Sequence, residues 1–172
     1  LAILTGMRVG EIAALTWDSI SKDGILINKS EKYNRKTNTY FIDATKNKKE
    51  RLFPMCNEIS NLLDKVKKAE LQNGYICEWV FANEDGRVHA PVISSCIKNK
   101  CRQLGIEERG IHALRKTFNS KIRNIGVAPT VAATLLGHSV EVNQKYYTFD
   151  VTSNDEKKEI VSLINENLPL AK

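Results

Sequence analysis

Apolar residues recur at helical spacing over most of the chain. Between residues 57 and 72, for example, Ile59, Leu62, Leu63 and Val66 return every three or four positions, the pattern of one buried helix face. Gly and Pro mark several helix ends, because Gly tolerates left-handed backbone angles and Pro fits a first helical turn. The pattern predicts helices at residues 1–4, 9–17, 57–72, 91–104, 112–125, 129–136, 142–147 and 155–167.

Three short runs near the N-terminus instead are rich in β-branched and aromatic residues. They cover residues 25–30, 39–45 and 51–55, and polar stretches at 31–38 and 46–50 separate them. Short runs joined by polar turns predict a small antiparallel meander. We therefore expect an α+β fold that is mainly α, a helical domain with a small three-stranded antiparallel sheet near the N-terminus.

Length and charge limit the classes of protein to which this chain can belong. The 172 residues fit one domain with a sizeable core. Lys and Arg number 26 against 20 for Asp and Glu, and the net charge of +6 is compatible with a polyanionic partner without requiring one. Apolar runs are too short to span a bilayer, so we expect no membrane partner. The chain opens inside an apolar run without Met, so we expect a fragment.

The four cysteines do not have the spacing of a metal site. Cys56, Cys77, Cys96 and Cys101 form no Cys-x-x-Cys pair, and no His stands at ligand spacing from them. We expect reduced, partly buried thiols in a cytoplasmic protein.

The residues with the clearest chemistry are suited to a phosphodiester. His112 and Arg115 are three apart, so on a helix a titratable imidazole shares one face with a permanent cation. Cleavage without a metal needs arginine forks on the phosphate oxygens, a nucleophile, a general base and a general acid. The candidates are Arg8 and Arg115 for the forks, His112 and His138 for the imidazoles, Lys46 for the acid, and a tyrosine of the pair Tyr146 and Tyr147. No carboxylate cluster of the kind that holds Mg²⁺ is present in the sequence.

Five short motifs, taken in order, resemble those of the tyrosine recombinases, the phage integrase family of site-specific DNA recombinases. They are residues 5–12 (TGMRVGEI) around Arg8, residues 45–54 (TKNKKERLFP) around Lys46, residues 112–115 (HALR), residues 135–139 (LLGHS) around His138, and Tyr147. Tyr147 follows His138 by nine residues, the usual spacing of the family's nucleophile. The five together, in this order and at this spacing, are specific.

The resemblance implies a mechanism in which DNA is cut and rejoined through a 3′-phosphotyrosyl intermediate. The implied roles are nucleophile for Tyr147, phosphate clamp for Arg8 and Arg115, general acid for Lys46, general base and acid for His112, and a hydrogen bond to the phosphate for His138. Because the 5′-hydroxyl of a partner strand reverses the step, the resemblance implies no cofactor.

The same resemblance implies the surroundings of the reaction. Residues 1–172 would form the catalytic domain, and the family's N-terminal core-binding domain, which closes a clamp around DNA, would be absent. The implied partner is double-stranded DNA, bound by a homotetramer on two sites. The implied location is the cytoplasm, for a protein of a prokaryotic cell or one encoded by a phage or mobile element.

Alternatives stay open at three points. Lys48 or Lys49 could replace Lys46 as the acid, because the turn is crowded with lysines. A type IB topoisomerase shares the tyrosine chemistry, and a DNA-binding derivative that no longer cuts would keep the basic charge. Individual residues also have ordinary structural explanations, such as an Arg8–Glu11 ion pair or a helix cap at His138.

Overall fold

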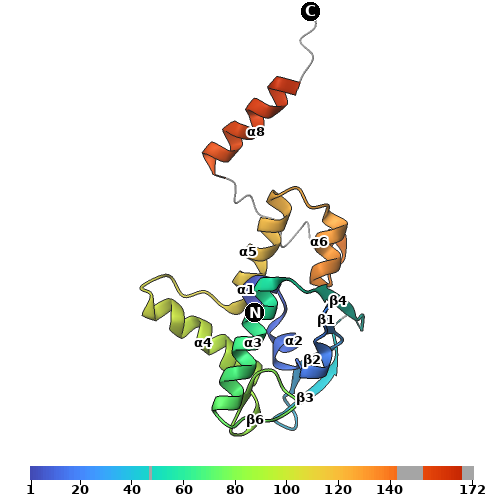
Figure 1. Cartoon of the computed structure of the whole chain (residues 1–172), viewed down its shortest axis with the longest axis vertical. Coiled ribbons are helices and arrows are strands. Elements are labelled where there is room, and N and C mark those ends of the chain that lie inside the picture. Colours follow the sequence, from blue (N-terminus) through green and yellow to red (C-terminus); the bar gives the residue numbers. More distant parts are fainter. Residues whose placement is uncertain (47, 143–152, 168–172) are drawn as a thin grey trace, which may run out of the picture.

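Helices form most of the fold, with short antiparallel strands near the N-terminus (Figure 1). The structure is a computed structural model that describes residues 1–46, 48–142 and 153–167, and the side chains within these ranges up to residue 163. Its elements are α1 (Ala2–Thr5), α2 (Val9–Ala13), the 3₁₀ turn η1 (Trp17–Ser19), β1 (Gly24–Ile27), β2 (Lys29–Asn34), β3 (Thr39–Ala44), β4 (Arg51–Pro54), α3 (Asn57–Gln72), β5 (Ala82–Asn83), β6 (Gly86–Arg87), α4 (Ala90–Gln103), α5 (Ile111–Asn124), α6 (Pro129–Leu136) and α8 (Asn154–Asn167).

Most predicted helices are confirmed to within one or two residues, and the α+β, mainly α fold class is confirmed with them. Helix α3 has the predicted bounds, and Ile59 and Leu63 are its buried positions. Helices α1 and α6 end at Gly6 and Gly137, which take left-handed φ angles of 61° and 64°. The helix predicted at 142–147 lies almost entirely outside the described residues.

The helix predicted at residues 9–17 is shorter than expected, because α2 ends at Ala13. The chain beyond it pairs with a distant segment instead of continuing the helix. The Trp17 amide donates to the Glu78 carbonyl at 2.9 Å, and the Val80 amide donates to the Leu15 carbonyl at 3.0 Å. These β-type bonds require an extended backbone, which residue Thr16 adopts.

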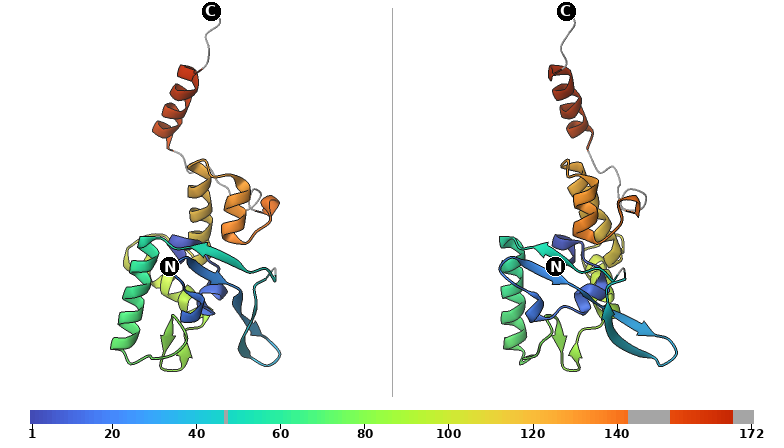
Figure 2. Two further views of the ribbon diagram at one scale, coloured as in Figure 1. Left: turned by 45° about the vertical axis from the view of Figure 1, so that its right-hand side comes forward. Right: turned by 90° about the vertical axis from the view of Figure 1, so that its right-hand side faces the viewer.

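The strands pair differently from the predicted meander. β1 pairs with β4, aligning Ile25 with Phe53, and β2 forms a separate hairpin with β3. Residues 31–34, predicted as a polar connection, belong to β2. The hairpin extends from the body of the molecule (Figure 2), so polar side chains are tolerated along it. β1 and β4 pair because their apolar side chains, including Ile25, Ile27 and Phe53, belong to the core.

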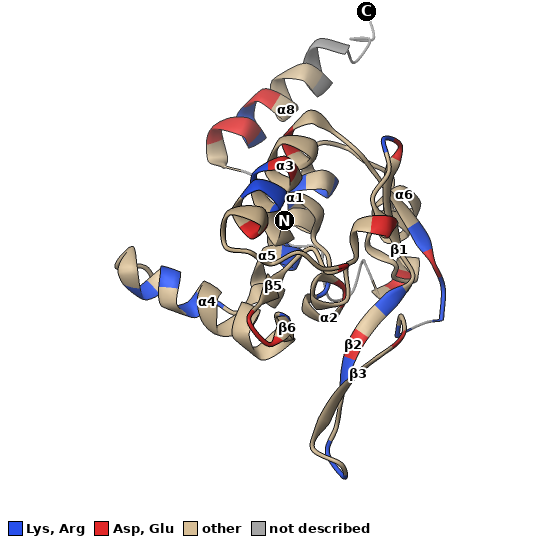
Figure 3. Cartoon of the chain, turned by 60° about the horizontal axis from the view of Figure 1, so that its bottom comes forward, with Lys and Arg blue, Asp and Glu red and all other residues tan. Residues whose placement is uncertain are grey.

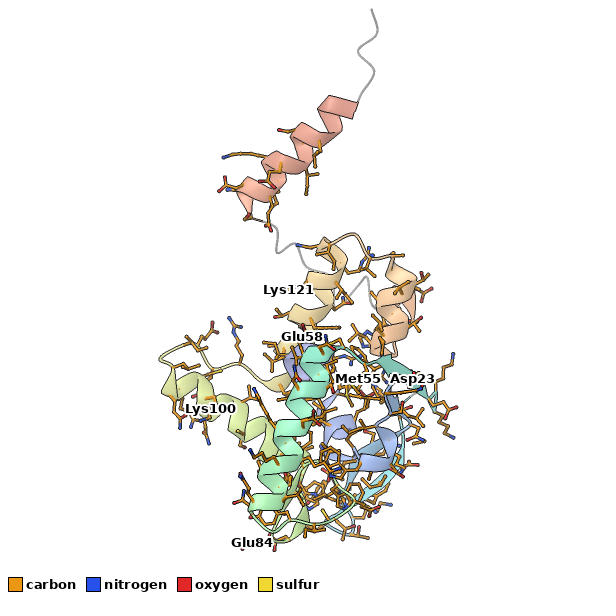
Figure 4. All side chains as sticks on the ribbon, in the orientation of Figure 1. Asp23, Met55, Glu58, Glu84, Lys100 and Lys121 are labelled. Carbon is orange, nitrogen blue, oxygen red and sulfur yellow. The ribbon has the colours of Figure 1, made fainter. Side chains whose placement is uncertain are left out.

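The core lies between α2, α3 and the strands β1 and β4. Its buried members are Met7, Ile12, Leu15, Ile25, Ile27, Phe53, Ile59, Leu63, Val80 and Ile111. Side chains are dense in this region (Figure 4). At its edge the Met55 amide donates to the Asp23 carbonyl at 3.2 Å, and Figure 4 shows these residues side by side where β4 ends. The core therefore fixes β4 relative to α2.

Helix packing brings four chain segments to one place. α1 packs against α5, α5 against α6, and α6 against β4. Both views of Figure 2 show α6 beside α5 and above the strands. The N-terminus of α2, the start of α5, the end of α6 and the β3–β4 connection therefore meet, and these segments carry the predicted site residues.

Helix α8 stands apart from this body (Figure 1). Its apolar side chains Ile160, Val161 and Leu163 are exposed. Within the described ranges, no helix has both the length and the apolar character needed to cross a membrane.

Candidate active site

Arg8 is fixed at the N-terminus of α2. It is the N-cap residue, and its backbone amide donates to Glu11 Oε2 at 2.9 Å while its Nη1 donates to Glu11 Oε1 at 2.9 Å. Its Nη2 donates to the Gly137 carbonyl at 3.2 Å. These bonds hold Arg8 between the start of α2 and the end of α6, with its side chain partly exposed.

Arg115 is buried on α5, with a relative exposure of 1%. Its Nη1 donates to the Gly6 carbonyl at 2.6 Å, and its Nη2 donates to the Leu136 carbonyl. The same Nη2 lies 2.6 Å from Nε2 of His138. A buried guanidinium needs such partners, because an unpaired buried charge is strongly destabilising. The ends of α1 and α6 supply them.

The glycines that end α1 and α6 each accept a hydrogen bond from one of the two arginines. Gly6, close to Arg8 in sequence, accepts from Arg115, and Gly137, next to His138, accepts from Arg8. Both glycines have positive φ, which disfavours a side chain there. A Cβ on Gly6 would also lie 2.8 Å from Phe118, so the helix ends could not pack as closely.

A buried carboxylate joins Arg8 to a second arginine. Glu11 has a side-chain exposure of 1% and accepts two bonds from Arg51, from Nη2 at 2.7 Å and from Nη1 at 3.1 Å. Burial alone would raise the pKa of Glu11, but the hydrogen bonds and charge of Arg51, and then those of Arg8, outweigh it and hold the pKa below its ordinary value. Glu11 is therefore a carboxylate at neutral pH.

Four predicted site residues converge on one cavity of about 390 Å³. Arg8, Lys46, His112 and Arg115 line it, from α2, the β3–β4 connection and α5. Its remaining walls are Met7, Val9, Gly10, Ser30, Glu31, Lys32 and Ile111. Arg8 also lines a neighbouring hollow together with His138. Five of the six predicted residues are thus brought together, and Tyr147, like Tyr146, lies outside the described residues.

The choice among the lysines stays a prediction. Lys46 lines the same cavity as His112, whereas Lys49 lines the hollow shared by Arg8 and His138. Lys48 has a left-handed backbone with φ of 52°, and its amide donates to the Thr45 carbonyl at 2.8 Å, which closes the turn. Among these three lysines, Lys46 is the one that lines the cavity together with both Arg8 and Arg115.

Both predicted histidines are neutral near pH 7. Burial, and then the charge of Arg115, lower the pKa of His112. The same two causes, joined by the charges of Arg8 and Arg51, lower the pKa of His138 to about 3. A neutral imidazole can accept a proton, as a general base must.

Two of the residues that hold the site are ones the sequence reasoning did not assign to it. The Arg8–Glu11 pair was an ordinary structural alternative, but the carboxylate is buried and carries two arginines. Arg51 belongs to the motif around Lys46, but no role was predicted for Arg51 itself. Both residues are charged and stand beside apolar residues in the sequence. A charge that is buried with such residues needs a partner, and this is the signal that could have identified them.

Glu31 at the cavity wall is a second buried carboxylate outside the predicted set. It accepts from Arg87 Nε at 2.9 Å, lies 2.6 Å from Nδ1 of His89, and accepts from the Ala90 amide at 2.9 Å. Burial would raise the pKa of Glu31, but the Ala90 amide and the two side chains lower it overall. These bonds attach β2 to the start of α4, so His89 has a structural role.

Lys and Arg residues occur on several elements of the fold. Figure 3 shows their positions along the β2–β3 hairpin, in the β3–β4 connection and along α4. Within the described residues, no group of three or more His, Cys, Asp or Glu side chains is arranged to hold a metal ion. Of the cysteines, all free thiols, only Cys101 is buried. The expectation of partial burial was wrong for Cys56, Cys77 and Cys96, which are exposed.

Comparisons with known proteins agree with this arrangement. The sequence profile of the Phage integrase family matches residues 1–152. A protein named tyrosine recombinase XerC-like, from Caldanaerobacter subterraneus subsp. tengcongensis, is 29% identical over 192 residues, which cover 96% of this chain and 48% of that protein.

Solved structures share the fold at low sequence identity. The Tn1549 transposon integrase in complex with transposon right end DNA superposes with a TM-score of 0.75 at 19% identity, covering 95% of this chain and 56% of that one. XerA recombinase gives a TM-score of 0.70 at 20% identity, covering 98% and 57%. XerH site-specific recombinase bound to difH substrate gives 0.63 at 17% identity, covering 95% and 43%.

The chain spans about half the length of these relatives. The profile match nevertheless covers most of the chain and includes the segments that carry the two arginines, the lysine and both histidines of the site. Since sequence profile, fold and site geometry agree, the chain belongs to the phage integrase family.

Proposed function

We propose that this chain is the catalytic domain of a site-specific DNA recombinase that cuts and rejoins DNA through a 3′-phosphotyrosyl intermediate. The observation that carries the proposal is the convergence of Arg8, Lys46, His112 and Arg115 on one cavity. Two guanidinium groups, an ammonium and a neutral imidazole are the groups that metal-free phosphoryl transfer requires.

Arg8 and Arg115 clamp the scissile phosphate in this proposal. Charge builds on the non-bridging oxygens as the nucleophile attacks, and preorganised arginines stabilise that charge without moving. Arg115 is suited to this because two helix ends fix its side chain. Arg8 is suited because Glu11 and the Gly137 carbonyl hold it while it stays partly exposed.

Proton transfer falls to Lys46 and His112. The hydroxyl of Tyr147 attacks phosphorus and its proton passes to the neutral imidazole of His112. The bond from phosphorus to the 5′-oxygen breaks, and Lys46 protonates that oxygen. The lowered pKa of His112 supports its part as base. His138 hydrogen-bonds the phosphate from the neighbouring hollow.

Rejoining reverses these steps. The 5′-hydroxyl of a partner strand attacks the phosphotyrosyl bond, which returns the proton to Tyr147 and leaves the recombined strand intact. Bond energy is kept in the intermediate, so the reaction needs no cofactor. Within the proposal, this chemistry takes place in the cytoplasm, and the gene belongs to a prokaryotic cell or to a phage or mobile element.

The proposed partner is double-stranded DNA. The net charge of +6 and the Lys and Arg positions along the hairpin and α4 support this choice (Figure 3). The Tn1549 integrase was solved in complex with transposon right end DNA, and XerH was solved bound to its difH substrate. Assembly is proposed as a homotetramer on two sites, with α8 docking on a neighbouring protomer because its apolar side chains are exposed.

The test is covalent capture on suicide DNA. Duplexes built from the sequences that flank the gene carry a nick placed so that the 5′-hydroxyl fragment diffuses away after cleavage. A recombinase accumulates an adduct that survives denaturation, and recombines two sites. DNA that is retarded in a native gel but forms no covalent adduct would point to a binding protein. Relaxation of a supercoiled plasmid that lacks any recombination site would point to a topoisomerase. Either result would overturn the proposal.

A further inference from the structure

Arg51 is a nearly buried arginine at the junction of three segments of the site. It is the first residue of β4, pairs across the sheet with Ile27, and follows Lys46 by five positions. Its side-chain exposure is only 8%. A long basic side chain is rarely buried to this extent unless specific bonds hold it.

The guanidinium of Arg51 makes two kinds of contact with one planar fork. Nη1 and Nη2 bind both oxygens of Glu11, and Nε donates to the Leu135 carbonyl at 2.9 Å. Leu135 belongs to the last turn of α6, and this helix ends at Leu136, just before Gly137 and His138. A lysine could not reproduce this set, because an ammonium is a point donor without a fork.

The first contact sets the charge on the cavity side. Glu11 receives Arg51 from one side and the backbone amide and Nη1 of Arg8 from the other. With Arg51 in place the three groups carry one net positive charge. Without Arg51 the carboxylate would be neutralised by Arg8 alone, and the site would lose net positive charge beside the phosphate.

The second contact sets the position of a turn. The backbone of Gly137 lies against the guanidinium, since a Cβ built there would lie 2.9 Å from Nη1 of Arg51. The Gly137 carbonyl in turn receives Nη2 of Arg8. By holding this turn, Arg51 fixes an acceptor of Arg8 as well as the residue that precedes His138.

We infer that Arg51 is a positioning residue for strand cleavage: by pairing with Glu11 and holding the α6 turn, it leaves the charge of Arg8 available to the scissile phosphate and keeps Arg8 aimed at it. The inference rests on the proposed function, because it assigns Arg51 to the phosphate clamp of that reaction. Arg51 acts through Arg8 and transfers no proton, so its loss weakens one specific task, the neutralisation of charge on the phosphate.

The experiment measures single-turnover adduct formation at saturating DNA by Arg51→Met. It uses two suicide substrates, one with the natural phosphodiester and one with a methylphosphonate at the scissile position. A methylphosphonate is neutral, so it lacks the charge that Arg8 must meet. Arg8→Met is the positive reference, and Arg109→Met, which removes an arginine that is 61% exposed in the connection between α4 and α5, is the matched control.

On the phosphodiester, Arg51→Met should cleave roughly 10²-fold more slowly than wild type, the cost typical of a misplaced catalytic group. DNA binding should stay within about 2-fold, since phosphate contacts over the whole duplex dominate affinity. On the methylphosphonate, both Arg51→Met and Arg8→Met should cleave less than about 10-fold more slowly than wild type, because this substrate has no phosphate charge for Arg8 to neutralise. Arg109→Met should match wild type on both substrates.

Three results would overturn the inference. Cleavage by Arg51→Met at the wild-type rate would show that Arg51 is dispensable. An equal deficit on both substrates would show a general loss of structure and no link to phosphate charge. Absence of any adduct from wild type would remove the proposed function itself, and the inference with it. If Arg51→Met does not fold, Arg51→Lys keeps the charge but not the fork, and a smaller deficit with the same methylphosphonate rescue is expected.

Discussion

Nε2 of His138 lies 2.6 Å from Nη2 of Arg115, and a guanidinium nitrogen can only donate. Nε2 must therefore accept, which places the imidazole proton on Nδ1 and requires His138 to be neutral. The pKa of about 3, lowered first by burial and then by Arg115, agrees with this tautomer. The relationship makes His138 a partner of Arg115 before any phosphate is bound.

This pairing predicts that the protein loses stability in mild acid. An unfolded chain protonates histidine near pH 6.5, but folded His138 stays neutral down to about pH 3. Between these values the unfolded state binds an extra proton, so the free energy of unfolding falls as pH drops, by up to about 1.4 kcal/mol per pH unit. Urea unfolding between about pH 6.5 and 4.5, above the titration of unfolded carboxylates, measures the slope.

The variant His138→Gln should flatten this slope, because its amide oxygen can still accept from Arg115 but does not titrate. His112→Gln is the matched control. His112 also has a lowered pKa, but this residue is more exposed than His138, so His112→Gln should flatten the slope less. A slope that is unchanged in His138→Gln would contradict the assignment of the neutral form.

Replacing Glu11 by Gln should destabilise the fold strongly. The change leaves Arg51, almost buried, and Arg8 without their shared carboxylate. Breaking a buried ion pair from one side costs on the order of 3–5 kcal/mol. Denaturant unfolding provides the measurement, and Glu159→Gln on the exposed face of α8 should change the free energy of unfolding by less than about 0.5 kcal/mol. Equal effects of the two changes would mean that the carboxylate is not a structural centre.

Replacing Lys46 by Ala should slow strand cleavage by about 10²–10⁴-fold, the usual contribution of a general acid. DNA binding should change little, because one ammonium is a small part of the basic surface. A substrate with a 5′-thio leaving group needs no proton, so it should restore the rate. If it does not, Lys46 is not the acid, and Lys48 and Lys49 become the residues to test.

Local signals in the sequence predicted much of the fold and most of the site. The helix at 57–72 was predicted from its own apolar spacing. The ends of α1 and α6 were predicted from Gly6 and Gly137, which stop a helix. The site residues were predicted from short motifs whose members lie within a few positions of one another.

What the sequence did not predict depends on partners far apart in the chain. The end of α2 at Ala13 follows from bonds between residues 15–17 and 78–80. The bonds of Arg51 to Glu11 and Leu135 span 40 and 84 positions. Such contacts depend on how the elements pack, and no pattern local to Arg51 identifies which carboxylate and which carbonyl it will meet.

The nucleophile is predicted to be Tyr147 and not Tyr146, both of which lie outside the described residues. The spacing of nine residues from His138 selects Tyr147. Adjacent positions on a helix point about 100° apart, so only one of the two hydroxyls can reach a given phosphate. Tyr147→Phe removes the attacking oxygen and keeps the ring, so the variant should fold and bind DNA but form no adduct on suicide DNA. Tyr146→Phe, the matched control, should still form one. If Tyr146→Phe abolishes the adduct and Tyr147→Phe retains it, the assignment is wrong by one residue, and so is the helical phase on which it depends.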